Sequence, residues 1–277
     1  MNKPRHLVVF DLDGTLLNKD SKLSALTQQT LTAMHQQGIH YTLATGRSYQ
    51  SANAIIEHEL FFLPQIYTNG VLTWCPNKNR FSFDNCLTVE QGVNAIKAME
   101  STAAAPFLSA IDSQEQKYIF HGKLQNQVEE KLLARFSEKK GTQILPVEQI
   151  KDGLHVTNIS MIGPSTDVLN AEHNISKDKQ LIAYSGPAMS QQDYRWIDVH
   201  HAKATKGSAV EKLKSQLEVD NIICFGDGDN DLSMFEIANE SYAPANANEQ
   251  VKQAATSVIG HHDEDGVALF LKERFGV

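Results

Sequence analysis

The sequence predicts an α/β protein with a doubly wound parallel sheet as its core and an inserted α+β domain. Strand-like and helix-like segments alternate from residue 7 to residue 70 and again after residue 205. Such alternation is typical of parallel strands joined by right-handed helical crossovers. The intervening residues have a different pattern, which indicates an insertion.

The chain is long enough for two domains. Its 277 residues are 41% hydrophobic, which allows a sizeable core. We assign residues 1–83 and 193–277 to one domain and residues 84–192 to the other. A net charge of −8, with no long basic run, gives no reason to expect a nucleic acid or an anionic membrane as partner. A small-molecule substrate fits this composition better.

Two carboxylates close the first predicted strand. Asp11 and Asp13 directly follow the apolar run Leu7–Phe10 and precede Gly14, so both lie at the carboxyl edge of the sheet, where α/β proteins bind ligands. Like charges this close repel, so a cation or a shared proton is expected between them. Beside Mg²⁺, one carboxylate can attack a phosphoryl group while the other transfers protons. Considered alone, the pair is explained equally well by an ordinary Asp-Gly turn.

Two further strands are expected to end at the same edge. Because parallel strands share their carboxyl ends, Thr45, Gly46 and Asn69 would lie near the two aspartates. A hydroxyl and free backbone amides before a helix suit phosphate oxygens, although a simple Thr-Gly turn stays open. The elements that give this arrangement are a helix from Ser24 to Gly38, a strand over 39–44, a helix to about Leu60 and a strand over 65–68.

The middle of the chain has the pattern of an α+β domain. A hairpin over residues 71–83 is expected to turn at 77–79. Gly186-Pro187 is the expected point of return to the first domain. Residue periodicity predicts helices over 89–100 and 125–140 and strands over 117–120 and 155–159.

The parallel pattern resumes near the C-terminus. Lys206-Gly207 opens an amphipathic helix, and the strand Ile222–Phe225 runs into the acidic segment Gly226–Asp231. Oxygen-bearing side chains at a strand end can complete a cation site. An EF-hand calcium loop is excluded, because the sixth residue counted from Asp227 is Leu232 rather than glycine.

Together these segments resemble a known set of motifs. Asp11-Leu12-Asp13-Gly14-Thr15-Leu16-Leu17, Ala44-Thr45-Gly46-Arg47, Lys206-Gly207 and Gly226–Asp231 are similar, in order and spacing, to four motifs of the haloacid dehalogenase-like (HAD) superfamily. The insertion resembles that of the Cof-type branch with a C2B cap. The resemblance implies a Rossmann-like catalytic core over 1–83 and 193–277 and a C2-type cap over 84–192. It also implies a phosphatase that acts on a small phosphate monoester such as a sugar phosphate.

The resemblance implies a role for each motif residue. Asp11 would be the nucleophile that forms an aspartyl-phosphate, and Asp13 would be the general acid/base. Asp11, the Asp13 backbone carbonyl and Asp227 would bind Mg²⁺, with Asp231 behind the metal. Lys206 would neutralise the transferring phosphoryl group. The remaining residues would hold phosphate (the Leu12 backbone, Thr45, Gly46 and Asn230) or face the substrate (Arg47 and Asn69).

Lys206 is unusual at a helix start, because the helix dipole disfavours a cation there. Phosphoryl transfer needs neutralisation of charge, which one lysine and one Mg²⁺ can supply. The alternative is a solvated lysine. Lys203 is the nearest substitute, though no glycine follows it.

The other notable residues receive structural interpretations. Adjacent residues on a strand point to opposite faces, so we expect the pairs His200-His201 and His261-His262 to be surface histidines rather than metal ligands. Cys224, within an apolar strand, is expected to be a buried thiol. With no apolar signal-peptide core or membrane-spanning run in the sequence, we expect a soluble, cytoplasmic protein.

Three functions are open at this point. A Mg²⁺-dependent phosphatase is favoured. A phosphomutase would use the same aspartyl-phosphate but return the group to its substrate. The third is a catalytically inactive phosphate- or metal-binding module, against which the intact Asp11 and Asp13 count. The substrate itself is not predicted, because no motif fixes the cap residues that would select it.

Overall fold

The computed structural model describes residues 5–56, 60–83, 85–100, 103–138, 141–188 and 193–277. The chain divides into two compact units: Met1–Ser82 with Thr205–Val277, and Phe83–Ala204. The predicted domain limits 84 and 192, the predicted helix end at residue 140 and residues 57–59 of an earlier predicted helix lie outside the described residues.

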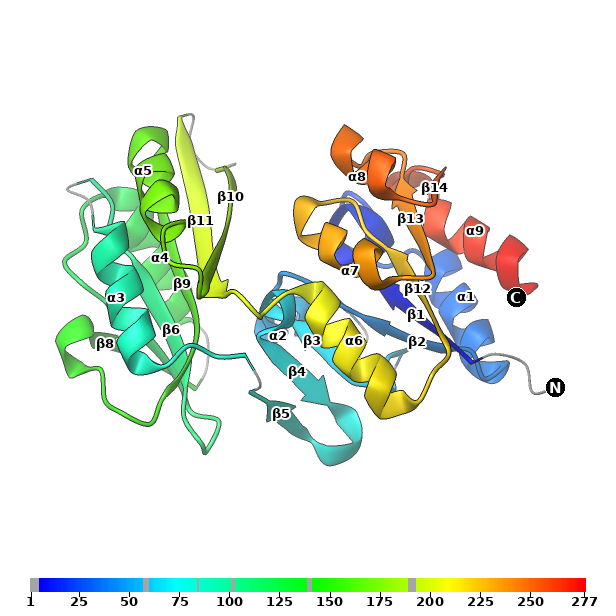
Figure 1. The fold of residues 1–277 in the computed structure, drawn as a ribbon, viewed down its shortest axis with the longest axis horizontal. Coiled ribbons are helices and arrows are strands. Elements are labelled where there is room, and N and C mark those ends of the chain that lie inside the picture. The colour runs from blue at the N-terminus through cyan, green and yellow to red at the C-terminus, as the bar shows by residue number, and fades with distance from the viewer. Residues whose placement is uncertain (1–4, 57–59, 84, 101–102, 139–140, 189–192) are drawn as a thin grey trace. The chain divides into compact units, whose positions relative to one another are not determined.

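The first unit is built on a five-stranded parallel sheet of order β14-β13-β12-β1-β2 (Figure 1). Leu7 and Val9 of β1 pack with apolar residues of α6 (Lys206–Leu217) and α7 (Leu232–Ile237). On the other face, Phe10 contacts Phe225, which packs in turn on Phe270 of α9. Helices therefore cover both faces, and the predicted doubly wound parallel sheet is confirmed. The strands are β1 (His6–Phe10), β2 (His40–Leu43), β12 (Asn221–Phe225), β13 (Glu240–Pro244) and β14 (Ser257–Ile259).

The helices of this unit begin and end largely where their sequence signals lie. Ser24 caps α1, because its side chain accepts a hydrogen bond from the Thr27 N–H at 3.0 Å, as predicted. α2 is shorter than predicted: it ends at Asn53 rather than near Leu60, and two β-branched residues of low helix propensity, Ile55 and Ile56, follow it closely. The helices are α1 (Ala25–Gln36), α2 (Tyr49–Asn53), α6 (Lys206–Leu217), α7 (Leu232–Ile237), α8 (Glu249–Ala254) and α9 (Gly266–Phe275).

A small antiparallel sheet adjoins the parallel one. It contains β3 (Gln65–Tyr67), β4 (Leu72–Cys75) and β5 (Arg80–Ser82), and the last two form the predicted hairpin with its turn at Pro76–Lys78. β3 is joined to the end of β2 by a parallel bridge between Ala44 and Ile66 and by a hydrogen bond of 3.0 Å from the Thr45 N–H to the Ile66 carbonyl. This bridge brings Asn69 toward the residues that follow β2.

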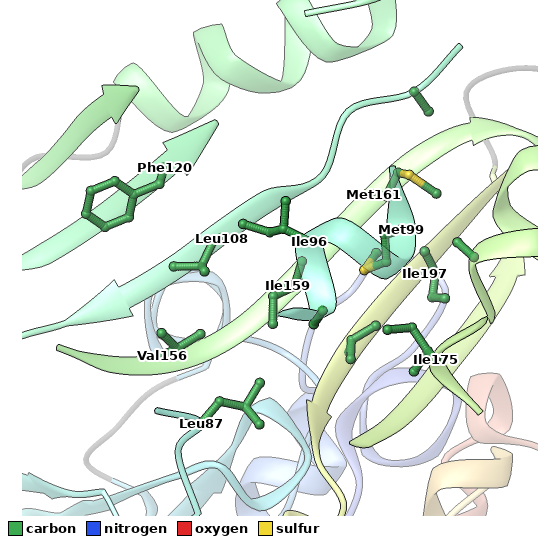
Figure 2. Close-up of a cluster of buried hydrophobic side chains, with 14 of the residues drawn as sticks. Leu87, Ile96, Met99, Leu108, Phe120, Val156, Ile159, Met161, Ile175 and Ile197 are labelled. Atoms are coloured by element: carbon green, nitrogen blue, oxygen red, sulfur yellow. The ribbon is translucent and has the colours of Figure 1, made fainter. Parts of the chain in front are cut away.

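The second unit is an α+β structure with a six-stranded sheet of order β10-β11-β9-β6-β7-β8. Its neighbouring strands are antiparallel except for β7 and β8. Figure 2 shows Ile96 and Met99 of α3 and Ile175 of α5 packed with Leu108, Ile159 and Ile197 of the sheet. The elements are α3 (Val89–Met99), β6 (Phe107–Ile111), β7 (Lys117–His121), α4 (Gln127–Ser137), β8 (Thr142–Pro146), β9 (His155–Pro164), α5 (Ser165–Ile175), β10 (Leu181–Pro187) and β11 (Tyr194–His201).

The second unit ends at Ala204 rather than near residue 192. β11 pairs with both β10 and β9, so its residues belong to the sheet of this unit. Gly186-Pro187, the expected return point, lies inside β10. Across the described residues, none of the helices has both the length and the apolar character needed to cross a membrane.

His200 is buried, so the prediction of a surface histidine is wrong for this residue. It is 1% exposed on β11, and its Nδ1 lies 3.3 Å from the Thr157 carbonyl oxygen. Burial lowers the pKa of His200 to about 4. Burial also raises the pKa of the nearby Asp198 to about 6.

We expect His200 to make the protein sensitive to mild acid. Between pH 6.5 and about 4 the unfolded chain binds a proton at this histidine and the folded chain does not, so the free energy of unfolding falls as the pH falls. Asp198 acts in the opposite direction over the same range. The contribution of His200 is therefore measured as the difference between wild type and His200→Leu in urea unfolding at about pH 7 and about pH 5. His173→Leu, at an exposed histidine of α5, is the matched control, and equal pH dependence in wild type and His200→Leu would contradict the prediction.

Candidate active site

The carboxyl ends of β1 and β12 bring the acidic residues together. The two strands pair in parallel with Phe10 opposite Phe225, and the Asp11 N–H donates a hydrogen bond to the Phe225 carbonyl at 2.9 Å. Asp11 therefore lies beside the loop Gly226–Asp231, as expected from the shared edge of parallel strands.

A buried lysine joins two of these carboxylates. Lys206 is the first residue of α6 and is 0% exposed. Its Nζ donates hydrogen bonds to Asp11 Oδ1 at 2.5 Å and to Asp231 Oδ1 at 2.6 Å. The lysine is thus desolvated, not solvated, whereas Lys203 is exposed.

Gly207 fixes the start of α6. A Cβ at this position would lie 2.0 Å from the Ser233 carbonyl oxygen, so only glycine permits the close approach of α6 to α7. The Gly207 N–H also donates a hydrogen bond to Ser233 Oγ at 3.1 Å. This contact places the neighbouring Lys206 at the acidic edge of the sheet.

The charges of this cluster perturb one another strongly. Burial raises the pKa of Asp11 well above its ordinary value, although Lys206 partly lowers it. Burial alone would lower the pKa of Lys206, but Asp11 and Asp231 outweigh this effect, so the pKa lies above its ordinary value and the amine stays charged. Burial, with a contribution from Asp231, raises the pKa of Asp227 to about 6. Such perturbed groups cluster at functional sites.

Asp231 also organises the loop that carries Asp227. Its second carboxylate oxygen, Oδ2, accepts hydrogen bonds from the backbone N–H groups of Asp227 at 2.9 Å and Gly228 at 3.0 Å. On the opposite side of Asp227, Thr15 Oγ1 donates a hydrogen bond to Asp227 Oδ1 at 2.9 Å. Gly14, with a φ of +72°, is so close that a Cβ there would lie 2.3 Å from Asp227 Oδ2. The side chain of Asp227 is therefore held between its own loop and the turn after β1.

Three carboxylates form a group suited to a hard divalent cation. Oxygen atoms of Asp11, Asp227 and Asp231 lie within 4.8 Å of one another. Lys206 balances only one of three negative charges, so a divalent cation would bring the group to neutrality. Carboxylate oxygens are also the ligands that Mg²⁺ prefers. The oxygen donors of these three residues therefore fit Mg²⁺. The group of three carboxylates includes Asp231 and does not include the carboxylate of Asp13.

Asp13 pairs instead with Arg47. The guanidinium Nε and Nη2 donate hydrogen bonds to the two oxygens of the Asp13 carboxylate, each at 2.6 Å. The Asp13 side chain is 51% exposed. The hydrogen bond to Asp13 is the main reason why the pKa of Arg47 lies above its ordinary value. Arg47, predicted to face the substrate, therefore also orients the predicted acid/base.

The predicted phosphate-binding residues meet near the same edge. A Cβ at Gly46 would lie 3.2 Å from Asn69 Oδ1 and 3.6 Å from Asn230 Nδ2, and the two asparagines share a hydrogen bond of 2.9 Å. Thr45 is 1% exposed, and its Oγ1 accepts a hydrogen bond of 3.1 Å from the Arg47 backbone N–H. The Leu12 side chain is fully buried, which leaves only its backbone for contact with a ligand.

Two residues not assigned to the site by sequence hold the turn Leu12–Leu16. Asn246 Nδ2 donates a hydrogen bond to the Gly14 carbonyl at 2.7 Å, and His262 Nδ1 donates one to the Leu17 carbonyl at 2.7 Å. The expectation of a surface histidine thus misses the role of His262. Asn246 follows the parallel strand β13. Its position after a strand end is the sequence feature from which its place in the site could have been predicted.

Comparison with known proteins gives a consistent result. Residues 8–271 match the protein family described as haloacid dehalogenase-like hydrolase. A Bacillus subtilis protein, 5-amino-6-(5-phospho-D-ribitylamino)uracil phosphatase YitU, is 26% identical over 283 residues, which cover 100% of both chains. A second protein of that organism with the same activity in its name, YwtE, is 26% identical over 96% of both chains.

Solved structures share the fold. A haloacid dehalogenase-like hydrolase from Bacteroides thetaiotaomicron has a TM-score of 0.74 and 23% identity, covering 98% of this chain and 100% of its own. A structure described as a HAD subclass IIB sugar phosphatase has a TM-score of 0.73 and 21% identity, covering 98% of each chain. These similarities extend over both units.

Proposed function

Because this chain belongs to the haloacid dehalogenase-like hydrolases, we propose that it is a Mg²⁺-dependent phosphatase that hydrolyses small phosphate monoesters through an aspartyl-phosphate. The observation that carries this proposal is the buried contact of Lys206 with both Asp11 and Asp231, beside Asp227. Burying these charges is costly for stability. Charged side chains fixed in such a site can stabilise the charge of a phosphoryl group during its transfer.

Each charged residue has a task in this reaction. Asp11 Oδ attacks phosphorus and displaces the alcohol, which takes a proton from Asp13. Asp13 then removes a proton from water, which hydrolyses the aspartyl-phosphate. Lys206 neutralises charge on the phosphoryl oxygens, and Arg47 holds the Asp13 carboxylate in place between the two steps.

The remaining groups would orient the substrate and the metal. The backbones of Leu12 and Gly46 and the side chains of Thr45 and Asn230 would hold phosphate oxygens. Asp11, the Asp13 carbonyl and Asp227 would hold Mg²⁺, and the position of Asp231 in the same carboxylate group adds a further candidate ligand. When bound, Mg²⁺ would polarise the phosphoryl group and lower the repulsion between it and Asp11.

We further propose that the substrate is a small phosphorylated metabolite, such as a sugar phosphate, selected by the second unit. Two relatives are named as phosphatases of 5-amino-6-(5-phospho-D-ribitylamino)uracil, and one structural neighbour is described as a sugar phosphatase. The net charge of −8 supports a small substrate rather than a nucleic acid. In this division of tasks, the first unit is the catalytic core and the second is its cap.

A panel of phosphorylated metabolites, assayed for release of inorganic phosphate, tests the proposed function. We expect turnover with Mg²⁺, none after chelation with EDTA, and recovery when Mg²⁺ is restored. Ca²⁺ should inhibit, because its larger and more flexible coordination shell would misplace the attacking carboxylate. Isomerised substrate without phosphate release would favour the phosphomutase. Full activity in metal-free buffer would contradict the metal-dependent mechanism.

A pair of neighbouring variants makes this test specific to the proposed metal site. Asp227→Asn should raise the Mg²⁺ concentration needed for half-maximal activity. Asp229→Asn, at an exposed position two residues away whose carboxylate accepts a hydrogen bond from Asn248, should leave that concentration unchanged. Equal effects of the two substitutions would show that the loop, rather than the carboxylate of Asp227, sets the metal requirement.

A further inference from the structure

The turn that carries Asp13 is anchored by apolar residues but has an irregular backbone. Leu12, Leu16 and Leu17 are buried, with exposures of 0%, 4% and 1%. Between them, Asp13 and Gly14 leave helical geometry, and Gly14 takes a left-handed φ of +72°. The Leu17 N–H closes the turn by donating a hydrogen bond to the Leu12 carbonyl at 2.9 Å. The direction of the Asp13 side chain depends on how firmly this short segment is held.

Side chains from the C-terminal part of the chain hold this segment at successive points. Asn246 Nδ2 binds the Gly14 carbonyl and His262 Nδ1 binds the Leu17 carbonyl, each at 2.7 Å. The Lys19 N–H donates a hydrogen bond to Asp263 Oδ1 at 2.8 Å. The three contacts span the turn and the residues after it.

The donors are themselves tied together. The His262 backbone N–H donates a hydrogen bond to Asn246 Oδ1 at 3.1 Å, so the two side-chain donors belong to one network. The segment around His262 is closed by the contact of Gly260 with Gly266, where a Cβ on Gly266 would lie 2.1 Å from the Gly260 carbonyl oxygen. Because the Leu17 carbonyl can only accept, the proton of the neutral His262 ring is at Nδ1. The histidine therefore acts as a fixed donor on a fixed loop.

The other side of the turn faces the reacting groups. Thr15 binds Asp227, Gly14 packs directly on the same carboxylate, and Asp13 lies one residue earlier. We infer that His262 is a positioning residue that, by holding the Leu17 carbonyl, fixes the turn that carries Asp13 beside Asp11 and Asp227. This inference rests on the proposed phosphatase function. A displacement of a catalytic group by about 1 Å can cost about 10²-fold in rate, so the contact has a measurable kinetic consequence.

Three substitutions isolate the hydrogen bond from the volume of the ring. His262→Phe keeps the ring and removes the donor. His262→Asn places an amide N–H near the position of Nδ1, and His262→Gln places it one methylene farther, near Nε2. The variants are assayed with p-nitrophenyl phosphate at saturating Mg²⁺. His262→Phe and His262→Gln should lower kcat by about 10- to 100-fold with little change in KM. Asn should restore most of the wild-type kcat.

Hydrogen exchange of the amides from residue 12 to residue 19 provides a readout that does not depend on activity. Exchange should accelerate in His262→Phe and His262→Gln and stay near wild type in His262→Asn, while the amides of the second unit are unchanged. A loss of kcat in Asn equal to that in Phe, or faster exchange with unaltered kcat, would overturn the inference. If the wild type hydrolyses no phosphate ester, the proposed function fails. Exchange then still decides whether His262 holds the turn.

Discussion

Asp11→Asn should keep the fold and lose at least about 10³-fold in kcat, because an amide neither attacks phosphorus nor balances the charge of a metal. The fold should survive, because asparagine is close to aspartate in size and Lys206 keeps its contact with Asp231. The measurement is phosphate release with the best substrate of the panel, together with thermal unfolding of both proteins.

Asp20→Asn is the matched control for this substitution. Asp20 is an exposed carboxylate on the segment that follows the turn, so its loss should change neither kcat nor thermal stability. Acid quenching of the wild type with radiolabelled substrate should trap phosphate on the protein, and Asp11→Asn should trap none. Residual activity of Asp11→Asn above about a tenth of wild type would remove its assignment as the nucleophile.

Lys206→Met should damage both activity and stability. The substitution leaves Asp11 and Asp231 buried without their shared cation, which costs about 3–5 kcal/mol when one partner of a buried ion pair is removed. It also removes the positive charge proposed to neutralise the phosphoryl group, so a fall of kcat by about 10³-fold or more is expected. Unfolding in urea at neutral pH and the phosphate-release assay measure the two effects.

The loss of stability in Lys206→Met should depend on pH in a defined direction. Without the lysine, which lowers it, the pKa of Asp11 rises further in the folded state. The folded chain then binds protons more readily than the unfolded one, and the deficit shrinks as the pH falls toward the ordinary pKa of aspartate, about 4. Lys206→Met combined with Asp231→Asn should recover stability but not activity.

Lys203→Met is the control for Lys206→Met, because Lys203 lies three residues earlier and is exposed. It should keep wild-type kcat. If Lys206→Met proved as stable as wild type at neutral pH, the two carboxyls would not both be ionised beside the lysine, and the charge count that favours a divalent cation would be wrong.

The positions of the acidic residues could be predicted from sequence because strand ends are encoded by simple patterns. Leu7–Phe10 and Ile222–Phe225 are apolar runs, and parallel pairing forces the residues that follow them to one edge. The pairing of Asp13 with Arg47 could not be predicted. It depends on the backbone dihedral angles inside the turn Leu12–Leu16, which no hydrophobic periodicity specifies.

The burial of His200 could not be predicted from the pattern of its strand. Polar residues alternate with apolar ones along β11, and this pattern is normally that of a strand with one solvated face. In the structure His200 is buried together with the apolar Ile197 and Val199. Polarity in the sequence therefore gave the wrong exposure for His200. The limit of the second unit differs for another reason: Gly186-Pro187, the expected return point, ends β10, and β11 then pairs in the same sheet.

The first unit is assembled from two chain segments, Met1–Ser82 and Thr205–Val277. Their strands β1 and β12 pair, although the entire second unit lies between them in the sequence. During synthesis Asp11 leaves the ribosome long before Lys206, Asp227 and Asp231, so no part of the reactive cluster can form on the early chain. The second unit is continuous in sequence and can fold first, as domains generally do. Its folding would then make this stretch compact and shorten the flexible loop that β1 and β12 must close. The insertion would in this way assist the folding of the unit that it interrupts, independently of any contact with substrate.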